Sequence, residues 1–289
     1  MSVAAVPTRD EAPRTKLFMR SGNWVNLYDP LAQDIVLEDW VVGASRAARY
    51  GGQTKGDYAY NVLQHSSLVE NILTDMVMPN ALPAYRLAAL CHDLHEGGGL
   101  GDIVTPYGKL FARAGLTEVK SRIDHALFES IGIAHPLSPE VKAAIKKADV
   151  IAAVTEAVQL MDWPERLARR DVGEGYEGPL WTKPIEILDE RASRAEWWGK
   201  FRELHDLVKK QEHTMPEGCR LAGSDATGRI LRIEGEFAVQ SAGRGAIVAH
   251  ELRKLTEETR AAVIQAVGTD AVLRIRNGKI AESEISRER

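Results

Sequence analysis

The sequence predicts a mainly α fold, a helical bundle followed by a small C-terminal α+β module. From about residue 38 to residue 211, apolar residues recur every three or four positions, the spacing of amphipathic helices. After about residue 217 the pattern changes to short β-type runs separated by glycine. We therefore expect a flexible leader at 1–16, a helical domain at 17–213 and an accessory module at 217–289.

Composition is that of a globular protein without a membrane span. Of the 289 residues, 44% are hydrophobic and 27% are charged, and no apolar run approaches the roughly 18 residues that a spanning helix needs. The N-terminus lacks the pattern of a secretory signal, and two distant cysteines give no disulfide framework. We expect a cytoplasmic protein, and its net charge of −4 gives no overall reason for nucleic-acid binding.

The helices of the bundle are delimited by their stop and start signals. Pro79 ends one long amphipathic segment, Gly97-Gly98-Gly99 ends the next, and Ser138-Pro139 begins another as an N-cap followed by proline. A glycine-rich acidic loop is expected at 171–178. After a helix that starts near Glu38, the predicted helices cover 58–78, 83–96, 123–133, 138–161 and 184–211.

The accessory module is predicted from four short β-type runs and one helix. The expected strands cover 228–233, 237–240, 246–249 and 271–276, with the helix at 257–267.

Metal-type ligands stand out from the apolar helices. His92-Asp93 closes an apolar helix, so other helices must supply the remaining ligands of any ion there. His65 borders the core face of its own helix, and Asp149 lies among apolar residues where an unpaired carboxylate would be costly to bury. Two imidazoles and two carboxylates suit divalent manganese, iron, cobalt, nickel or zinc. Taken singly, each of these residues is more often a structural or solvated side chain.

The order of these residues, His, then His-Asp, then Asp on separate helices, resembles that of the HD superfamily of phosphohydrolases. The stretch from about residue 21 to residue 161 resembles YfbR-type 5′-deoxynucleotidases and related phage and plasmid HD hydrolases. The segments that carry the resemblance are Arg49–Thr54, Tyr60–Ser66, His92-Asp93 with Glu96, Gly101–Pro106, and Ala148-Asp149 with Glu156.

The resemblance implies roles for further residues. Glu96 and Asp102 match acidic residues that orient or deprotonate the attacking water and pass a proton to the leaving oxygen. Arg49 matches a phosphate-binding arginine, and Tyr50 matches an aromatic residue that packs on the sugar and disfavours a ribose 2′-hydroxyl. Thr105 is a further candidate for contact with sugar or phosphate. A surface glutamate and an exposed arginine beside a core tyrosine are the simpler alternatives.

His95 is an additional imidazole beside this group. It could contact phosphate or join a second metal, but a solvent-facing histidine at a helix end is the expectation.

The C-terminal stretch resembles the KfrB-like module of conjugative-plasmid proteins. Gln240, Gly243, Arg244, Gly245 and His250 carry this resemblance, and Arg244 between two glycines could approach a phosphate, although a hairpin with an exposed arginine is the simpler interpretation. A nucleic-acid or protein partner is expected for this module.

The predicted function is metal-dependent hydrolysis of 2′-deoxynucleoside 5′-monophosphates. The resemblance also implies a homodimer, since proteins of the family it resembles commonly dimerise. One alternative is a dNTP triphosphohydrolase, and another is a non-catalytic DNA-binding plasmid factor, which predicts salt-dependent DNA binding without phosphate release.

Overall fold

The computed structural model describes residues 15–112, 115–133, 135–212, 219–222, 225–242 and 246–281. Backbone packing divides the chain into two compact units. The first comprises Met1–Val69, Leu90–His135 and Val150–Trp198, and the second comprises Glu70–Ala89, Pro136–Asp149 and Gly199–Arg289. The division differs from the boundary expected near residue 217, because the second unit also includes parts of the helical region.

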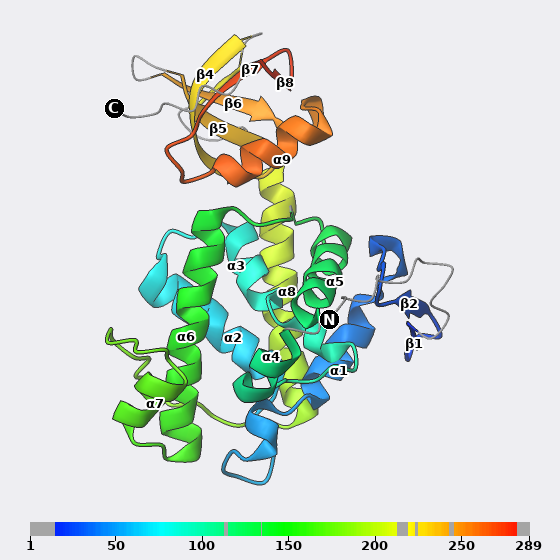
Figure 1. Ribbon diagram of the computed structural model, residues 1–289, viewed down its shortest axis with the longest axis vertical. Helices are drawn as coiled ribbons and strands as arrows, with labels where there is room; N and C mark the ends of the chain where they lie inside the picture. The colour runs from blue at the N-terminus through cyan, green and yellow to red at the C-terminus, as the bar shows by residue number, and fades with distance from the viewer. Residues whose placement is uncertain are drawn as a thin grey trace, which may run out of the picture. The chain divides into compact units, whose positions relative to one another are not determined.

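Helices dominate the chain up to residue 212, which confirms the prediction of a mainly α protein with a small C-terminal α+β module (Figure 1). None of the described helices is long and apolar enough to cross a bilayer. The α-helices are α1 (Leu37–Arg46), α2 (Val62–Ile72), α3 (Pro83–Cys91), α4 (Thr105–Ala112), α5 (Leu116–Ser130), α6 (Pro139–Met161), α7 (Glu165–Asp171), α8 (Glu190–Glu212) and α9 (Glu257–Ala266).

The predicted helix boundaries differ most from the observed ones where side chains or tertiary packing hold the backbone in a non-helical conformation. Helix α6 begins as predicted, with the Ser138 hydroxyl accepting a hydrogen bond from the Val141 amide at 3.4 Å. Helix α8 begins six residues later than expected, since Gln64 and Gln159 accept hydrogen bonds from the backbone of the segment before it. Helices α4 and α7 were not predicted, and α5 begins seven residues earlier than expected.

A two-stranded antiparallel hairpin precedes α1. Strand β1 (Lys16–Phe18) pairs with β2 (Trp24–Asn26), and Phe18 contacts Trp24 with ring centroids 4.9 Å apart. The expected leader at 1–16 therefore overlaps β1 at its last residue, and its first 14 residues lie outside the described part of the chain.

Two glycines let α1 approach the segment after α3. A Cβ on Gly43 would overlap the Gly97 carbonyl, and a Cβ on Gly97 would overlap the Trp40 carbonyl. Trp40 itself is fully buried and lies against Gly98. The sequence predicted only that Gly97-Gly98-Gly99 ends a helix by its flexibility. In the structure, Gly97 and Gly98 also allow the segment after α3 to pack closely against α1.

The C-terminal module contains a six-stranded sheet with the order β3-β6-β5-β4-β7-β8. Neighbouring strands are antiparallel except for the parallel pair β3 and β6. Helix α9 contributes Val263 and Ala266 to a core shared with the sheet residues Ile230, Ala238 and Ile275. The strands are β3 (Arg220–Leu221), β4 (Asp225–Glu234), β5 (Phe237–Ser241), β6 (Ile247–Glu251), β7 (Val272–Arg276) and β8 (Lys279–Ile280).

Candidate metal centre

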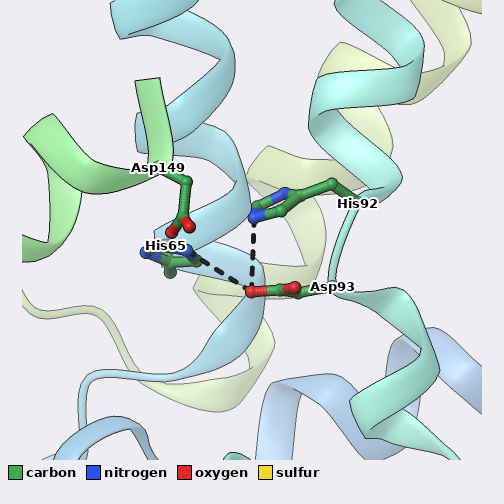
Figure 2. Close-up of side chains that lie close together, drawn as sticks. All are labelled: His65, His92, Asp93 and Asp149. Atoms are coloured by element: carbon green, nitrogen blue, oxygen red, sulfur yellow. Dashed lines mark ion pairs between the residues drawn. The ribbon is translucent and has the colours of Figure 1, made fainter. Parts of the chain in front are cut away.

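The structure brings the four predicted metal ligands together. His65, His92, Asp93 and Asp149 each place a ligand atom within 4.8 Å of the others (Figure 2). One carboxylate oxygen of Asp93 lies 3.5 Å from His65 Nε2 and 3.2 Å from His92 Nε2. Two imidazoles and two carboxylates around one point form a donor set suited to a borderline divalent ion, so this cluster of side chains could bind a metal.

His92 and Asp93 reach the cluster because α3 ends before them. The prediction that the helix continues to Glu96 is wrong: regular helix stops at Cys91, and a 3₁₀ turn at Leu94–Gly97 follows. Gly97 packs against the backbone of α1, which holds this turn away from the α3 axis. The chain thus leaves the helix at His92 and Asp93, the two residues whose side chains meet His65 and Asp149.

Asp149 lies on α6 and is more exposed than the apolar residues around it in the sequence suggested. Its side chain is 21% exposed and accepts an ion pair from the surface residue Lys146 at 2.8 Å. Burial cost alone was therefore a weak argument for this ligand. Its place beside the two histidines is the stronger one.

Glu156 organises the buried side of the centre, a role that the sequence reasoning missed although the residue was quoted in a motif. Its side chain on α6 is fully buried, and its carboxylate lies 2.7 Å from His65 Nδ1. The same carboxylate accepts a hydrogen bond from the Tyr60 hydroxyl at 3.2 Å, and its other oxygen lies 3.2 Å from the Tyr50 hydroxyl oxygen. A donor on Nδ1 leaves Nε2 of His65 as the metal-facing nitrogen, the arrangement found around many metal-binding histidines.

Electrostatics keep this carboxylate ionised. Burial alone would raise the pKa of Glu156, but the charges of His65 and Arg49 and their hydrogen bonds lower it to about 2. Asp93 behaves alike, since the effect of His92 and His65 outweighs burial and holds its pKa well below the usual range. Both carboxylates are therefore negative at neutral pH, as a cation site requires.

Arg49, Tyr50 and Asp102 form a connected group that reaches the metal cluster through Glu156, the carboxylate that contacts His65. The Arg49 guanidinium forms ion pairs with Asp102 at 3.4 Å and with Glu156 at 3.3 Å, and its buried Nε has no hydrogen-bond partner among the described residues. Asp102 also accepts the Tyr50 amide at 3.0 Å. With both oxygens engaged, Asp102 is placed to hold Arg49 and its neighbour, and its predicted part in proton transfer stays a prediction.

The Tyr50 side chain is held by the protein at both its hydroxyl and its ring, so it is not a freely exposed surface for stacking on a sugar. Its hydroxyl donates to the Ala153 carbonyl at 2.7 Å, and its ring packs on a small apolar cluster that contains Val154 and Ala168. The residue has a φ of 54°, a left-handed conformation that is strained for a large side chain. Thr105 begins α4, and its side chain lies outside the described part of the structure.

Glu96 and His95 both point into the interior from the 3₁₀ turn, and each is only 5% exposed. Burial, followed by the charges of Asp93 and Asp102, raises the pKa of Glu96 to about 7. The expectation that His95 faces solvent is wrong, since its Nδ1 lies 2.8 Å from Asp124 on α5. Local sequence patterns could not show that contact, because Asp124 lies 29 positions after His95.

The C-terminal residues that carried the second resemblance are only partly described. Gln240 and His250 are buried and hydrogen-bonded to each other at 2.7 Å, so both serve the core of the sheet. Gly243, Arg244 and Gly245 lie outside the described residues.

Comparison with known proteins identifies one relative and no domain type. No family model matches the chain. An uncharacterized protein of Rhodobacter capsulatus, RCAP_rcc00048, is 39% identical over 156 residues, which cover 54% of this chain and 78% of the relative.

Proposed function

This chain belongs to the family of that uncharacterized Rhodobacter capsulatus protein, and we propose that it is a metal-dependent phosphohydrolase of the HD type. The observation that carries the proposal is the convergence of His65, His92, Asp93 and Asp149 within 4.8 Å. Their order along the chain matches the HD pattern, and their chemistry suits manganese, cobalt, iron, nickel or zinc.

The proposed reaction is removal of phosphate from a 2′-deoxynucleoside 5′-monophosphate. Water attacks phosphorus, the bond to the 5′ oxygen breaks, and that oxygen takes up a proton, which yields the deoxynucleoside and inorganic phosphate. A bound divalent ion supplies positive charge for the phosphate oxygens and lowers the pKa of water. The choice of substrate rests on the resemblance to YfbR-type enzymes around Arg49-Tyr50 and Gly101–Pro106.

Residues beside the ion have distinct tasks. Arg49, which is held by Asp102 and Glu156, presents its remaining donors to the phosphate. Glu96, with a pKa near 7, can accept a proton from water and return it to the leaving oxygen at neutral pH. Tyr50 closes the apolar side of the site, where it would meet the sugar.

A panel of nucleotides tests the proposal. Phosphate release would be measured from deoxy- and ribonucleoside mono- and triphosphates with added manganese or cobalt, for the natural protein and Asp93→Ala. Asp270→Ala serves as the matched control, because Asp270 is 91% exposed in the C-terminal module.

Monophosphate turnover that Asp93→Ala abolishes and Asp270→Ala retains is the expected result. Turnover of triphosphates alone, with release of tripolyphosphate, would replace the nucleotidase by a dNTP triphosphohydrolase. Absence of turnover with every nucleotide, despite bound metal, would contradict the enzyme proposal and direct attention to salt-dependent DNA binding by the C-terminal module.

A further inference from the structure

A second group of ligand-type side chains lies next to the first. Asp93, His95 and Glu96 place one ligand atom each within 4.8 Å of one another, and Asp93 belongs to both groups. His95 and Glu96 come from the 3₁₀ turn that Gly97 holds against α1, so the backbone fixes their approach. The two groups therefore meet at one carboxylate.

Two atoms of this group are buried without a partner. Nε2 of His95 and Oε2 of Glu96 have no hydrogen-bond partner among the described residues, although both side chains are about nineteen-twentieths buried. Buried polar atoms are nearly always paired, so two unpaired atoms on adjacent residues indicate a missing ligand. A divalent cation would satisfy both at once.

His95 is oriented in the way that metal-binding histidines usually are. Its Nδ1 contacts the Asp124 carboxylate at 2.8 Å, which leaves Nε2 as the nitrogen that can bind a cation. A carboxylate behind an imidazole fixes the ring and increases its basicity as a ligand. Helix α5 supplies this carboxylate, just as α6 supplies Glu156 to His65.

The charges around Asp93, His95 and Glu96 favour the binding of one more cation. The group itself carries the carboxylates of Asp93 and Glu96, and Arg49 is already paired with Asp102 and Glu156. Lys120 on α5 lies 3.5 Å from Oε1 of Glu96, on the oxygen opposite the unpaired one. It partly neutralises Glu96 but does not occupy Oε2.

From these observations we propose that the centre binds two divalent cations, the second held by Asp93, His95 and Glu96 with Asp93 shared between them. The proposal deepens the proposed function and rests on it for its catalytic meaning. Paired ions in phosphohydrolases stand about 3.5–4 Å apart and bind the attacking and leaving oxygens. Three protein ligands leave open positions for water or a phosphate oxygen. When the second cation is bound, Glu96 is a ligand, and its proton-accepting task belongs to the one-ion form.

The experiment counts manganese ions in the full-length protein. Equilibrium dialysis with Mn²⁺ alone gives the stoichiometry, and electron paramagnetic resonance of the loaded protein distinguishes a coupled pair from isolated ions. We expect two ions per chain with a coupled signal. His95→Gln should bind one ion, while His125→Gln, an exposed histidine on the same helix as Asp124, should retain two.

Lys120→Gln keeps the proposal testable if His95→Gln fails to fold. Removing a positive charge 3.5 Å from Glu96 should tighten the second ion several-fold and leave the first nearly unchanged. A residue with a purely structural role would not produce that result.

Binding of a single ion by the natural protein at saturating Mn²⁺ would overturn the proposal, and so would two coupled ions in a folded His95→Gln. The two proposals fail separately. One bound ion with nucleotide turnover removes only the second site, whereas two bound ions without turnover remove only the proposed function.

Discussion

The C-terminal sheet and the metal centre both bury polar side chains, but they differ in whether the buried polar atoms have hydrogen-bond partners. In the C-terminal sheet, the Gln240 amide donates to the carbonyls of Gly228 at 3.0 Å and Leu273 at 2.8 Å, and its oxygen lies 2.7 Å from His250 Nε2. In the metal centre, buried atoms of Arg49, His95 and Glu96 have no partner among the described residues. A saturated network connects strands, whereas an unsaturated one at the same depth indicates that a ligand completes it.

The largest effect on catalysis is expected at Glu96, a buried carboxylate of the metal centre with an oxygen that has no hydrogen-bond partner among the described residues. Glu96→Gln keeps the size of the side chain but removes the carboxylate that accepts a proton in the one-ion form and holds the second cation in the two-ion form, so kcat should fall by roughly 10²–10⁴-fold. Steady-state kinetics on a deoxynucleoside monophosphate measures the change. Glu118→Gln, an exposed glutamate on α5, should leave kcat as it is. Equal rates for Glu96→Gln and the natural enzyme would remove Glu96 from the mechanism.

Glu156→Gln tests whether the carboxylate behind His65 positions a ligand or merely fills the core. The amide cannot balance the charges of His65 and Arg49, so the affinity of the protein for manganese should fall about 10–100-fold. Metal titration alongside thermal melting of the metal-free protein separates the two roles. A lower melting temperature with unchanged manganese affinity would show that Glu156 is structural.

In the C-terminal sheet the same kind of change should affect stability alone. Gln240→Ala leaves two carbonyls and His250 without their partner, which should cost about 1–3 kcal/mol for each group left unsatisfied. Denaturant unfolding measures the loss, and phosphate release should stay the same. Gln265→Ala, an exposed position on α9, is the control. Loss of turnover in a folded Gln240→Ala protein would mean that the module takes part in catalysis.

The smallest effect is a pH dependence of the same sheet. Burial lowers the pKa of His250, so the folded state resists a proton that the unfolded chain accepts near pH 6.5. The free energy of unfolding should therefore decrease as the pH falls below about 6.5 and level off below the folded pKa. Comparing His250→Gln with the natural protein isolates this contribution. An identical pH dependence in both proteins would contradict it.

How much of the centre could be predicted from sequence depended on whether the signal was local. His92-Asp93 is a contiguous pair, and its order with His65 and Asp149 is visible along the chain, so all four residues of the cluster could be identified from the sequence. Glu156 was quoted without a role, since its contacts with His65 and Tyr60 join residues more than 90 positions apart. His95 was misplaced because the contact that buries it comes from α5, 29 positions further along the chain.

The fold showed the same limit. Periodicity predicted α6 and most of the C-terminal strands closely, because hydrophobic spacing and turn residues are encoded within each segment. It extended α3 past Cys91, where close packing of Gly97 on α1 ends the helix early. Sequence-local rules cannot foresee that packing, and it is the feature that presents His92, Asp93 and Glu96 to one site.

The most direct test of the account is to locate the metal. A crystal of the full-length protein grown with Mn²⁺ would be measured at the manganese absorption edge, and the anomalous difference map inspected. The account predicts a peak within coordinating distance of His65, His92, Asp93 and Asp149 that is lost in Asp93→Ala. A map without a peak among these four residues, from crystals of a protein that binds manganese in solution, would contradict it.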